Sequence, residues 1–250
     1  MNRGIYTSAS GMIAEMVRTD TIANNLANCN TAGYKKDINI SKDFNNMLIE
    51  RIRDGTTPPP KVGPLGTGPL SWENFVVHKS GGFIETGNSL NVAINGSGYF
   101  TVDTPGGIRY TRNGTFTLSN EGMLVTMDGY PVLGAGGTSI TVFDNQPINI
   151  SGDGRIFNGD QEIGQLGLID VDDTRAMRKE AGVFFRLDDR TAVRPFTGRI
   201  VGGMLETSNV NIIEEMVNLI ASYRAYEINA KGVQSHDQLN EKAVNDVGRA

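Results

Sequence analysis

The chain has 250 residues, a formal net charge of −5 and a single cysteine, Cys29. The length allows one or two domains with cores of their own, the acidic balance disfavours a nucleic-acid-binding protein, and one cysteine excludes an intrachain disulfide. No apolar run is long enough to predict a membrane-spanning helix, and no apolar segment near the start predicts a cleaved signal peptide. Composition alone therefore predicts a cytoplasmic protein.

A first helix is expected over residues 4–28, because apolar and small residues recur there in steps of four and three. Such steps average 3.5 residues, which is the period of a coiled-coil seam. Three asparagines near the end of this segment disfavour an isolated helix, so we expect it to need a packing partner. The stripe, with Ile22 beside it, is predicted to be a subunit interface; its residues are Ile5, Ala9, Met12, Met16, Thr19, Ala23 and Leu26.

Residues 31–71 are predicted to form a connector. Ser41 is a suitable N-cap for a short second helix that would end at Gly55. An apolar stripe at helical spacing supports this helix: Phe44, Leu48 and Ile52. The segment 56–69 holds five prolines and three glycines, a composition that excludes a helix and predicts an extended, fairly stiff chain.

Short strands are predicted from residue 72 to residue 205. Leu90, Val92 and Ile94 alternate along one strand, and Asn95-Gly96 marks a tight turn before the next. Turn signals then recur at intervals typical of antiparallel sheets: Pro105-Gly106-Gly107, Asn113-Gly114, Glu121-Gly122, Asp128-Gly129 and Gly136-Gly137. The segments 116–124 and 148–156 share a strand–turn–strand pattern, which we attribute to similar hairpins rather than to a true repeat.

A last helix is expected from Asn211 to about Val244, with Glu214 and Glu215 favourable in its first turn. At 1.5 Å per residue it would be about 50 Å long. It carries a second stripe at coiled-coil spacing, also predicted to be a subunit interface: Ile212, Met216, Leu219, Tyr223, Tyr226, Ala230 and Val233. An alternative is that the two terminal helices pack on each other within one chain as an ordinary antiparallel pair.

The predicted fold class is therefore α+β. Long, coiled-coil-like helices at the two ends, over 1–30 and 211–250, form a terminal helical domain. They flank a mainly antiparallel β domain over 72–205, and the connector joins the two.

No catalytic, metal or cofactor site is predicted. His78 and His236 lack Cys, His or carboxylate partners at metal-ligand spacing, and the adjacent acidic pairs lie where turns and helix caps explain them. We therefore expect a protein that is not an enzyme and that binds no cofactor and no small-molecule substrate. The rival of another class is a ligand-binding β module on a helical stalk. An enzyme with carboxylates at 170–173 in a pocket is the weakest rival.

Several segments resemble the flagellar basal-body rod and hook proteins. Residues 23–28 read Ala-Asn-Asn-Leu-Ala-Asn, residues 30–35 read Asn-Thr-Ala-Gly-Tyr-Lys, and the opening run Gly-Ile-Tyr-Thr-Ser-Ala-Ser-Gly-Met at 4–12 is similar too. Further agreement lies in the segments 86–100, 110–116, 205–211 and 224–231. The motif residues carried over from this family are Asn24, Asn25, Asn28, Gly33, Tyr34 and Asn209.

The resemblance implies an architecture in layers: an inner pair of coiled-coil helices from both termini, a connecting segment and an outer β domain. It also implies subunits that stack helically into the rod that crosses the periplasm, with partners that are further copies, other rod and hook proteins and the flagellar export apparatus. Neither nucleic acid nor membrane insertion is expected. Export through the flagellar channel needs no cleaved signal, so the resemblance overrules the cytoplasmic expectation.

Within the family, the chain is most similar to the proximal-rod members. The short connector after residue 55 and the entry into the last helix at 204–210 carry this likeness. Distal-rod members come second, and hook proteins, which are usually longer, come third. Asn91 stands where an aspartate is common in the family, which puts a turn or a subunit contact in question but not the fold.

Overall fold

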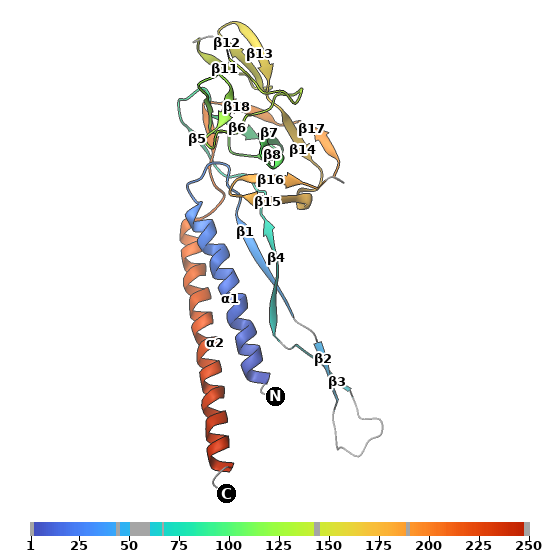
Figure 1. The fold of residues 1–250 in the computed structure, drawn as a ribbon, viewed down its shortest axis with the longest axis vertical. Coiled ribbons are helices and arrows are strands. Elements are labelled where there is room, and N and C mark those ends of the chain that lie inside the picture. The colour runs from blue at the N-terminus through green and yellow to red at the C-terminus, as the bar shows by residue number, and fades with distance from the viewer. Residues whose placement is uncertain are drawn as a thin grey trace. The chain divides into compact units, whose positions relative to one another are not determined.

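The computed structural model describes residues 3–43, 46–50, 61–66, 68–142, 146–188 and 191–247. The chain folds as two compact units, each built from separate stretches of sequence (Figure 1). Unit 1 comprises Met1–Leu26, Asp37–Phe75 and Ile212–Ala250, and unit 2 comprises Ala27–Lys36 and Val76–Asn211. The fold class is α+β, as predicted.

Unit 1 contains both helices, α1 (Arg3–Ala27) and α2 (Ile212–Val247), which confirms the two helices expected from the sequence. The 36 residues of α2 span about 54 Å. Asn211 directly precedes α2, and Glu214 and Glu215 occupy its first turn, where carboxylates favour the helix dipole. Unit 1 also holds two ribbons: β1 (Asp37–Asp43) with β4 (Pro69–Val76), and β2 (Asn46–Glu50) with β3 (Lys61–Gly66).

The short helix expected from Ser41 to Gly55 is wrong. Ser41 lies inside β1, and Leu48 lies in β2, which pairs antiparallel with β3 through Leu48↔Pro64 and Ile49↔Gly63. The apolar step of four residues caused the error, because positions i and i+4 share one face of a strand as well as one face of a helix. Because β3 is present as a partner strand, the segment forms a strand and not a helix. Phe44, Ile52 and Gly55 lie outside the described residues.

Part of the expected extended segment 56–69 is also strand, since β3 covers Lys61–Gly66 and β4 begins at Pro69. Pro64 is tolerated because β3 belongs to a two-stranded ribbon, and a proline can place its missing N–H on the unpaired edge. Residues 56–60 and Thr67 lie outside the described residues.

Unit 2 is a set of antiparallel sheets. A six-stranded sheet has the order β15-β16-β8-β7-β14-β17, a three-stranded sheet the order β11-β12-β13, and three further pairs are β10-β9, β18-β6 and β19-β5. The strands are β5 (Phe83–Glu85), β6 (Val92–Asn95), β7 (Tyr99–Thr104), β8 (Gly107–Thr111), β9 (Phe116–Leu118), β10 (Leu124–Thr126), β11 (Ile148–Ile150), β12 (Arg155–Asn158), β13 (Gln161–Gln165), β14 (Leu168–Val171), β15 (Met177–Ala181), β16 (Phe184–Leu187), β17 (Val193–Pro195), β18 (Arg199–Gly202) and β19 (Met204–Glu206). A short 3₁₀ helix, Thr174–Ala176, precedes β15.

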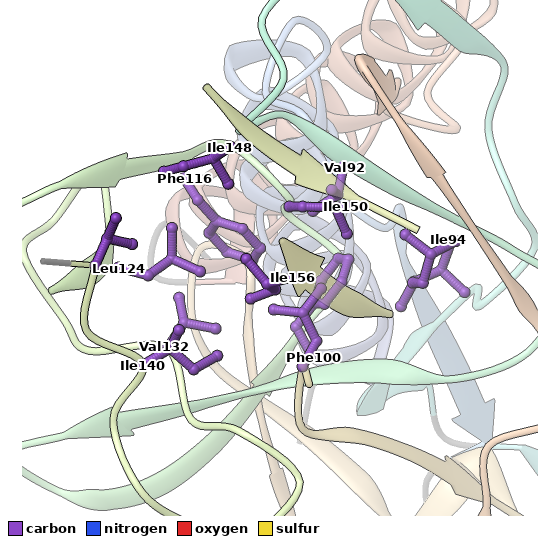
Figure 2. Packing of buried hydrophobic residues seen from close by; sticks show 13 residues of the cluster. Val92, Ile94, Phe100, Phe116, Leu124, Val132, Ile140, Ile148, Ile150 and Ile156 are labelled. Atoms are coloured by element: carbon purple, nitrogen blue, oxygen red, sulfur yellow. The ribbon is translucent and has the colours of Figure 1, made fainter. Parts of the chain in front are cut away.

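The main core of unit 2 is an apolar cluster between these sheets (Figure 2). Phe100 and Phe116 meet edge to face at its centre, with ring centroids 5.1 Å apart. Val92 and Ile94 of β6 are fully buried, and so is Ala93 between them. The strand at 92–95 is therefore confirmed, and both of its faces are covered. β6 pairs with β18 and not with the strand that follows the Asn95-Gly96 turn.

Two hairpins of unit 2 explain the internal similarity in the sequence. In β9–β10, Ser119 N donates to Met123 O and Gly122 N donates to Ser119 O. In β11–β12, the residues 32 positions later repeat both hydrogen bonds, with Ser151 and Gly154 in the equivalent places. Gly122 and Gly154 have φ of +76° and +83°, so the same glycine-dependent turn closes both hairpins.

Candidate subunit interface and buried polar clusters

The two helices of unit 1 lie side by side and antiparallel (Figure 1). Ser222 of α2 donates to the Glu15 carboxylate at 2.6 Å, and its hydroxyl lies 3.0 Å from that of Thr19. One heptad towards the α2 N-terminus, Asn25 donates to Glu215 at 3.4 Å. Asn25, Glu215 and Ser222 are each 1% exposed. The helices therefore meet through polar side chains that are buried and hydrogen-bonded.

Glycines bring the same two helices into close contact further along. A Cβ on Gly11 would lie 2.9 Å from the Asn229 amide nitrogen, and a Cβ on Gly4 would overlap the ring of His236. On α1 the positions Gly4, Gly11 and Asn25 lie at multiples of seven residues. On α2, Glu215, Ser222, Asn229 and His236 do the same. We call this set of small and polar contacts the helix seam.

The predicted apolar stripes follow the helix seam by one residue. Ile5 and Met12 come directly after Gly4 and Gly11, and Met216, Tyr223 and Ala230 come directly after Glu215, Ser222 and Asn229. One residue rotates a side chain by about 100° around the helix. The antiparallel pairing within one chain, which the sequence left as an alternative, is thus observed, but the stripes flank its seam instead of forming it.

The predicted interface residues consequently differ in exposure. Those most open to solvent are Met16 at 52%, Met216 at 48% and Tyr223 at 58%, with Ile212 at 39% and Ala23 also exposed. Ile22 is only 6% exposed and belongs to the helix seam side. The remaining predicted residues are half-buried: Ile5, Ala9, Met12, Leu26, Leu219, Tyr226, Ala230 and Val233.

Both stripes lie on one side of the helix pair. In an antiparallel pair, residues rotated in the same sense from the seam project to the same side, and both stripes are displaced by one residue towards the C-terminus. Together they form one apolar surface, which we call the apolar flank: Met12, Met16, Ala23, Met216 and Tyr223. Other exposed apolar residues of the two helices lie outside the sequence stripes, among them Tyr6, Ile13, Ile213, Val217, Ile220 and Ile228. A wider apolar arc on α2 was the signal that could have found the last four.

The motif asparagines hold main chain in place. In unit 1, the Asn25 amide accepts from Asp37 N at 2.9 Å and donates to Asp37 O at 2.8 Å, so it pairs with that residue as a neighbouring strand would. In unit 2, Asn209 accepts from Lys36 N at 2.7 Å and donates to the carbonyls of Val77 and Lys79 at 2.8 and 2.9 Å. Only a side chain with a donor and an acceptor can do this.

The turn after α1 uses the other motif residues. Asn28 accepts from the Thr31 hydroxyl at 3.3 Å, whereas Asn24 is exposed. Gly33 has φ of +70°, and a Cβ there would overlap the main chain of Arg112, so only glycine fits. Tyr34 is fully buried, with the Lys179 ammonium 3.6 Å from its ring centroid.

A buried ionic cluster in unit 2 was missed at the sequence level. Lys35 donates to one Glu206 oxygen at 2.6 Å, and Arg112 donates to the other at 3.3 Å. Gly81 N adds a third donor at 3.0 Å. Lys35 and Glu206 side chains are 0% exposed. Burial lowers the pKa of Lys35, and the Glu206 carboxylate opposes that shift. The three partners come from distant segments, so no local pattern could reveal them.

The titratable residues considered for chemistry have structural partners. His78 Nδ1 lies 2.7 Å from the Tyr99 hydroxyl; burial, aided by the cations of Lys35, Arg112 and Lys179, lowers the pKa of His78 to about 4. Burial raises the pKa of Tyr99 to about 12.

An enzyme that would use the carboxylates at 170–173 was the weakest rival interpretation, and these carboxylates also have structural partners. Asp170 accepts from the Ser97 hydroxyl at 2.6 Å, Asp172 pairs with Arg194, and Asp173 caps the 3₁₀ helix. Within the described ranges, no three His, Cys, Asp or Glu side chains group as a metal site would require. Among the helices that the structure describes, none has the length and apolar character needed to span a membrane.

Comparison with known proteins places this architecture in a family. Residues 5–35 match the model of flagella basal body rod proteins, residues 93–158 that of the flagellar hook protein FlgE/F/G D1 domain, and residues 201–246 that of the flagellar basal body rod FlgEFG protein C-terminal region. The first and third matches cover most of α1 and α2, which form the helix seam.

Similar proteins extend the match to the whole chain. The rod protein FlgF of Caulobacter vibrioides is 35% identical over 252 residues, covering 100% of this chain and 99% of that protein. FlgF of Rhizobium meliloti is 35% identical over 251 residues, covering 99% of each. FlgG of Bacillus subtilis is 33% identical over 264 residues, covering 98% of this chain and 99% of that protein. The chain therefore belongs to the flagellar basal-body rod proteins, the structural subunits of the flagellar rod.

Proposed function

We propose that this chain is a proximal-rod subunit of the FlgF type, which polymerises helically into the drive shaft that transmits motor torque. The observation that carries the proposal is the apolar flank. The helix seam already occupies the facing sides of α1 and α2, yet Met16, Met216 and Tyr223 are each about half exposed or more. Exposed apolar residues gathered on one side of a helix pair mark a protein–protein contact.

Assembly follows from where the apolar flank lies. A flank on one side of the helix pair contacts a different surface of the next subunit, and such heterologous contacts build open helical arrays. We infer that the helices at 1–30 and 211–250 pack as coiled coils in the axial core. The segment 31–71 connects this core to an outer β domain over 72–205. Close packing of long helices would resist twist.

The remaining aspects of the proposed function follow from the same role. The partners are further copies, other rod and hook proteins and the flagellar export apparatus, which would pass the chain without a cleaved signal. The site is the rod where it crosses the periplasm and cell wall. In this function the protein is not an enzyme, binds no small molecule and no nucleic acid, and does not insert into a membrane.

Alignment length supports a FlgF-type subunit over a FlgG-type one. The FlgF alignments extend over 252 and 251 residues, close to the length of this chain. The FlgG alignment extends over 264 residues while covering less of this chain, so FlgG carries insertions relative to it. A distal-rod subunit remains the alternative that the experiment below separates.

The test is deletion of the gene in its native host, followed by complementation and isolation of basal bodies. We expect non-swimming cells whose basal bodies stop before the proximal rod is complete. A rod that stops only after its proximal part would instead support the distal assignment. Complete basal bodies in the deleted strain would contradict the rod function itself.

Complementation with Met216→Glu tests the apolar flank. Because Met216 is exposed, the purified variant should unfold at the same temperature as the original chain, yet basal bodies should not be completed. Gln238→Glu, which adds the same charge at an exposed polar position of α2, is the control and should restore swimming. Restored swimming with Met216→Glu would exclude the flank as the contact.

A further inference from the structure

Unit 2 carries an unusual set of arginines at one edge of its six-stranded sheet. Arg178 of edge strand β15 lies directly opposite Arg186 of β16 in the strand register. Like charges opposite each other destabilise a strand pair. Arg109 of β8 joins them, because Glu180 accepts from Arg109 at 2.6 Å and pairs with Arg186 at 3.2 Å. We call Arg109, Arg178 and Arg186 the arginine face.

Among the residues that the structure describes, the arginine face carries more positive than negative charge. Glu180 is shared between two of its guanidinium groups, and Arg178 is exposed and makes no ion pair with any residue in the described ranges. Arg178 and Arg186 line a cleft of about 270 Å³ together with Leu187 and Asp188. Among the described residues, three cations thus face two carboxylates, Glu180 and Asp188. The cleft can therefore accept a carboxylate from another molecule.

A complementary surface lies on the same chain. Three carboxylates lie at the β12–β13 hairpin and the turn that leads into it, namely Asp160, Glu162 and Asp153. Arg155 of β12 pairs with Asp153 at 3.0 Å and with Glu162 at 3.7 Å. Asp160 stands in the two-residue turn of the hairpin, is exposed and has no ion-pair partner among the residues that the structure describes. We call this the acidic hairpin.

The two surfaces lie at opposite ends of unit 2. In Figure 1, β12 and β13 form the top of this unit, and β15 and β16 lie at its other end. Two complementary patches at opposite ends of one body cannot close into a two-fold dimer, but they can join copies head to tail. The whole chain carries a net charge of −5, so copies that approach each other are repelled unless opposite charges meet.

We propose that the arginine face of one copy receives the acidic hairpin of the next, with Asp160 entering the cleft at Arg178. The contact rests on the proposed rod function and adds a second, electrostatic connection between β domains to the apolar one between helices. It orients successive copies, because complementary charge fixes register more than it adds affinity. Such a contact weakens as salt concentration rises.

The test is a charge exchange in the complemented strain, using the full chain. Arg178→Glu and Asp160→Lys should each reduce the number of completed basal bodies at least fivefold. The double variant Arg178→Glu/Asp160→Lys should restore them, because each copy again presents opposite charges at its two ends and the net charge is unchanged. Asp128→Lys, at another exposed turn carboxylate, is the control and should have no effect.

A second variant guards against misfolding. Asp160→Asn keeps a residue that tight turns accept and removes only the charge, so circular dichroism should be unchanged while completion still falls. Unimpaired completion in all single variants, or failure of the double variant to restore it, would overturn the contact. Absence of the unaltered chain from purified basal bodies would instead overturn the rod function, so the two failures can be told apart.

Discussion

Single residues that are buried or half-buried determine how the segments of unit 2 are joined. Glu206 neutralises two cations, Lys35 and Arg112, from elsewhere in the chain. Asn209 accepts a hydrogen bond from the main chain of Lys36. Gly33 lies so close to the main chain of Arg112 that no Cβ would fit there. Removing the charge of Glu206 should lower the stability most, because a buried ion without its partner keeps its full desolvation cost.

Glu206→Gln should therefore be severely destabilising. It leaves two buried cations without a counterion, and we expect a loss of about 3–5 kcal/mol in the free energy of unfolding. Denaturant unfolding of the full chain, followed by fluorescence, measures it. Glu180→Gln is the matched control, because its partners are partly exposed and its loss should stay below about 1 kcal/mol. Equal losses in the two variants would contradict the role assigned to Glu206.

His78 should make the stability depend on pH. Its pKa in the folded chain is about 4, below the ordinary value of 6.5, because burial and nearby cations disfavour its protonated form. The unfolded chain then binds the proton first, so stability is complete above pH 6.5 and is lost as the pH falls towards 4. The loss should be about 2 kcal/mol after allowance for the part of the ring that water reaches.

The comparison with His78→Asn isolates this effect from the carboxylates that titrate in the same range. An asparagine amide can still meet the Tyr99 hydroxyl but does not titrate, so its unfolding free energy should fall less between pH 6.5 and pH 4. Parallel pH profiles for the two proteins would show that folding does not lower the pKa of His78.

Sequence reasoning identified the motif residues but not what they do. Asn25, Gly33, Tyr34 and Asn209 were selected because they resemble a family pattern. Their roles depend on partners far along the chain; Asn209, for example, bonds to a residue 173 positions away. A side chain reveals such a role only when the fold has brought its partner near, so the sequence alone could not supply it.

At the scale of elements, predictions succeeded where the signals were local. Both long helices and the glycine turns were found, since periodicity, caps and turn residues act over a few positions. The helix expected at Ser41 failed because its spacing also suits a strand. The contact between the two helices of one chain lies one residue before each predicted stripe, because glycines and serines allow close approach there, and the stripes stay a prediction of a subunit interface.

Gly11→Leu tests the helix seam directly. Helix propensity by itself favours leucine over glycine by about 1 kcal/mol, so an isolated helix would gain stability. In the seam, the larger side chain would overlap Asn229, and we expect a net loss of about 1–3 kcal/mol for the helix pair. Thermal unfolding followed by far-ultraviolet circular dichroism measures the sign. Asp20→Leu, at an exposed position of α1, should not destabilise the chain, and a stabilised Gly11→Leu variant would rule the seam out.

At the scale of the whole molecule, the two units combine stretches that the predicted division of the chain did not group together. The sequence suggested that the terminal helices belong together and that a β domain lies between them. It did not foresee that β1 and β4 join the helices in unit 1, or that residues 27–36 belong to unit 2. Composition changes gradually along these segments, whereas membership of a unit depends on long-range contacts.

The residues that meet in the helix seam lie far apart along the chain, and this affects the order of folding. Glu15 and Ser222 are 207 residues apart, and closing a flexible loop of that length would cost about 5 kcal/mol. Unit 2 lies almost entirely between them and, once folded, shortens the loop. We therefore expect unit 2 to fold first and the helix pair last. A chain that emerges from its N-terminus presents α1 long before α2 exists, so a product that ends before Ile212 lacks the α2 part of unit 1. A chain that ends before α2 therefore cannot form the helix seam, so only full-length chains can complete unit 1.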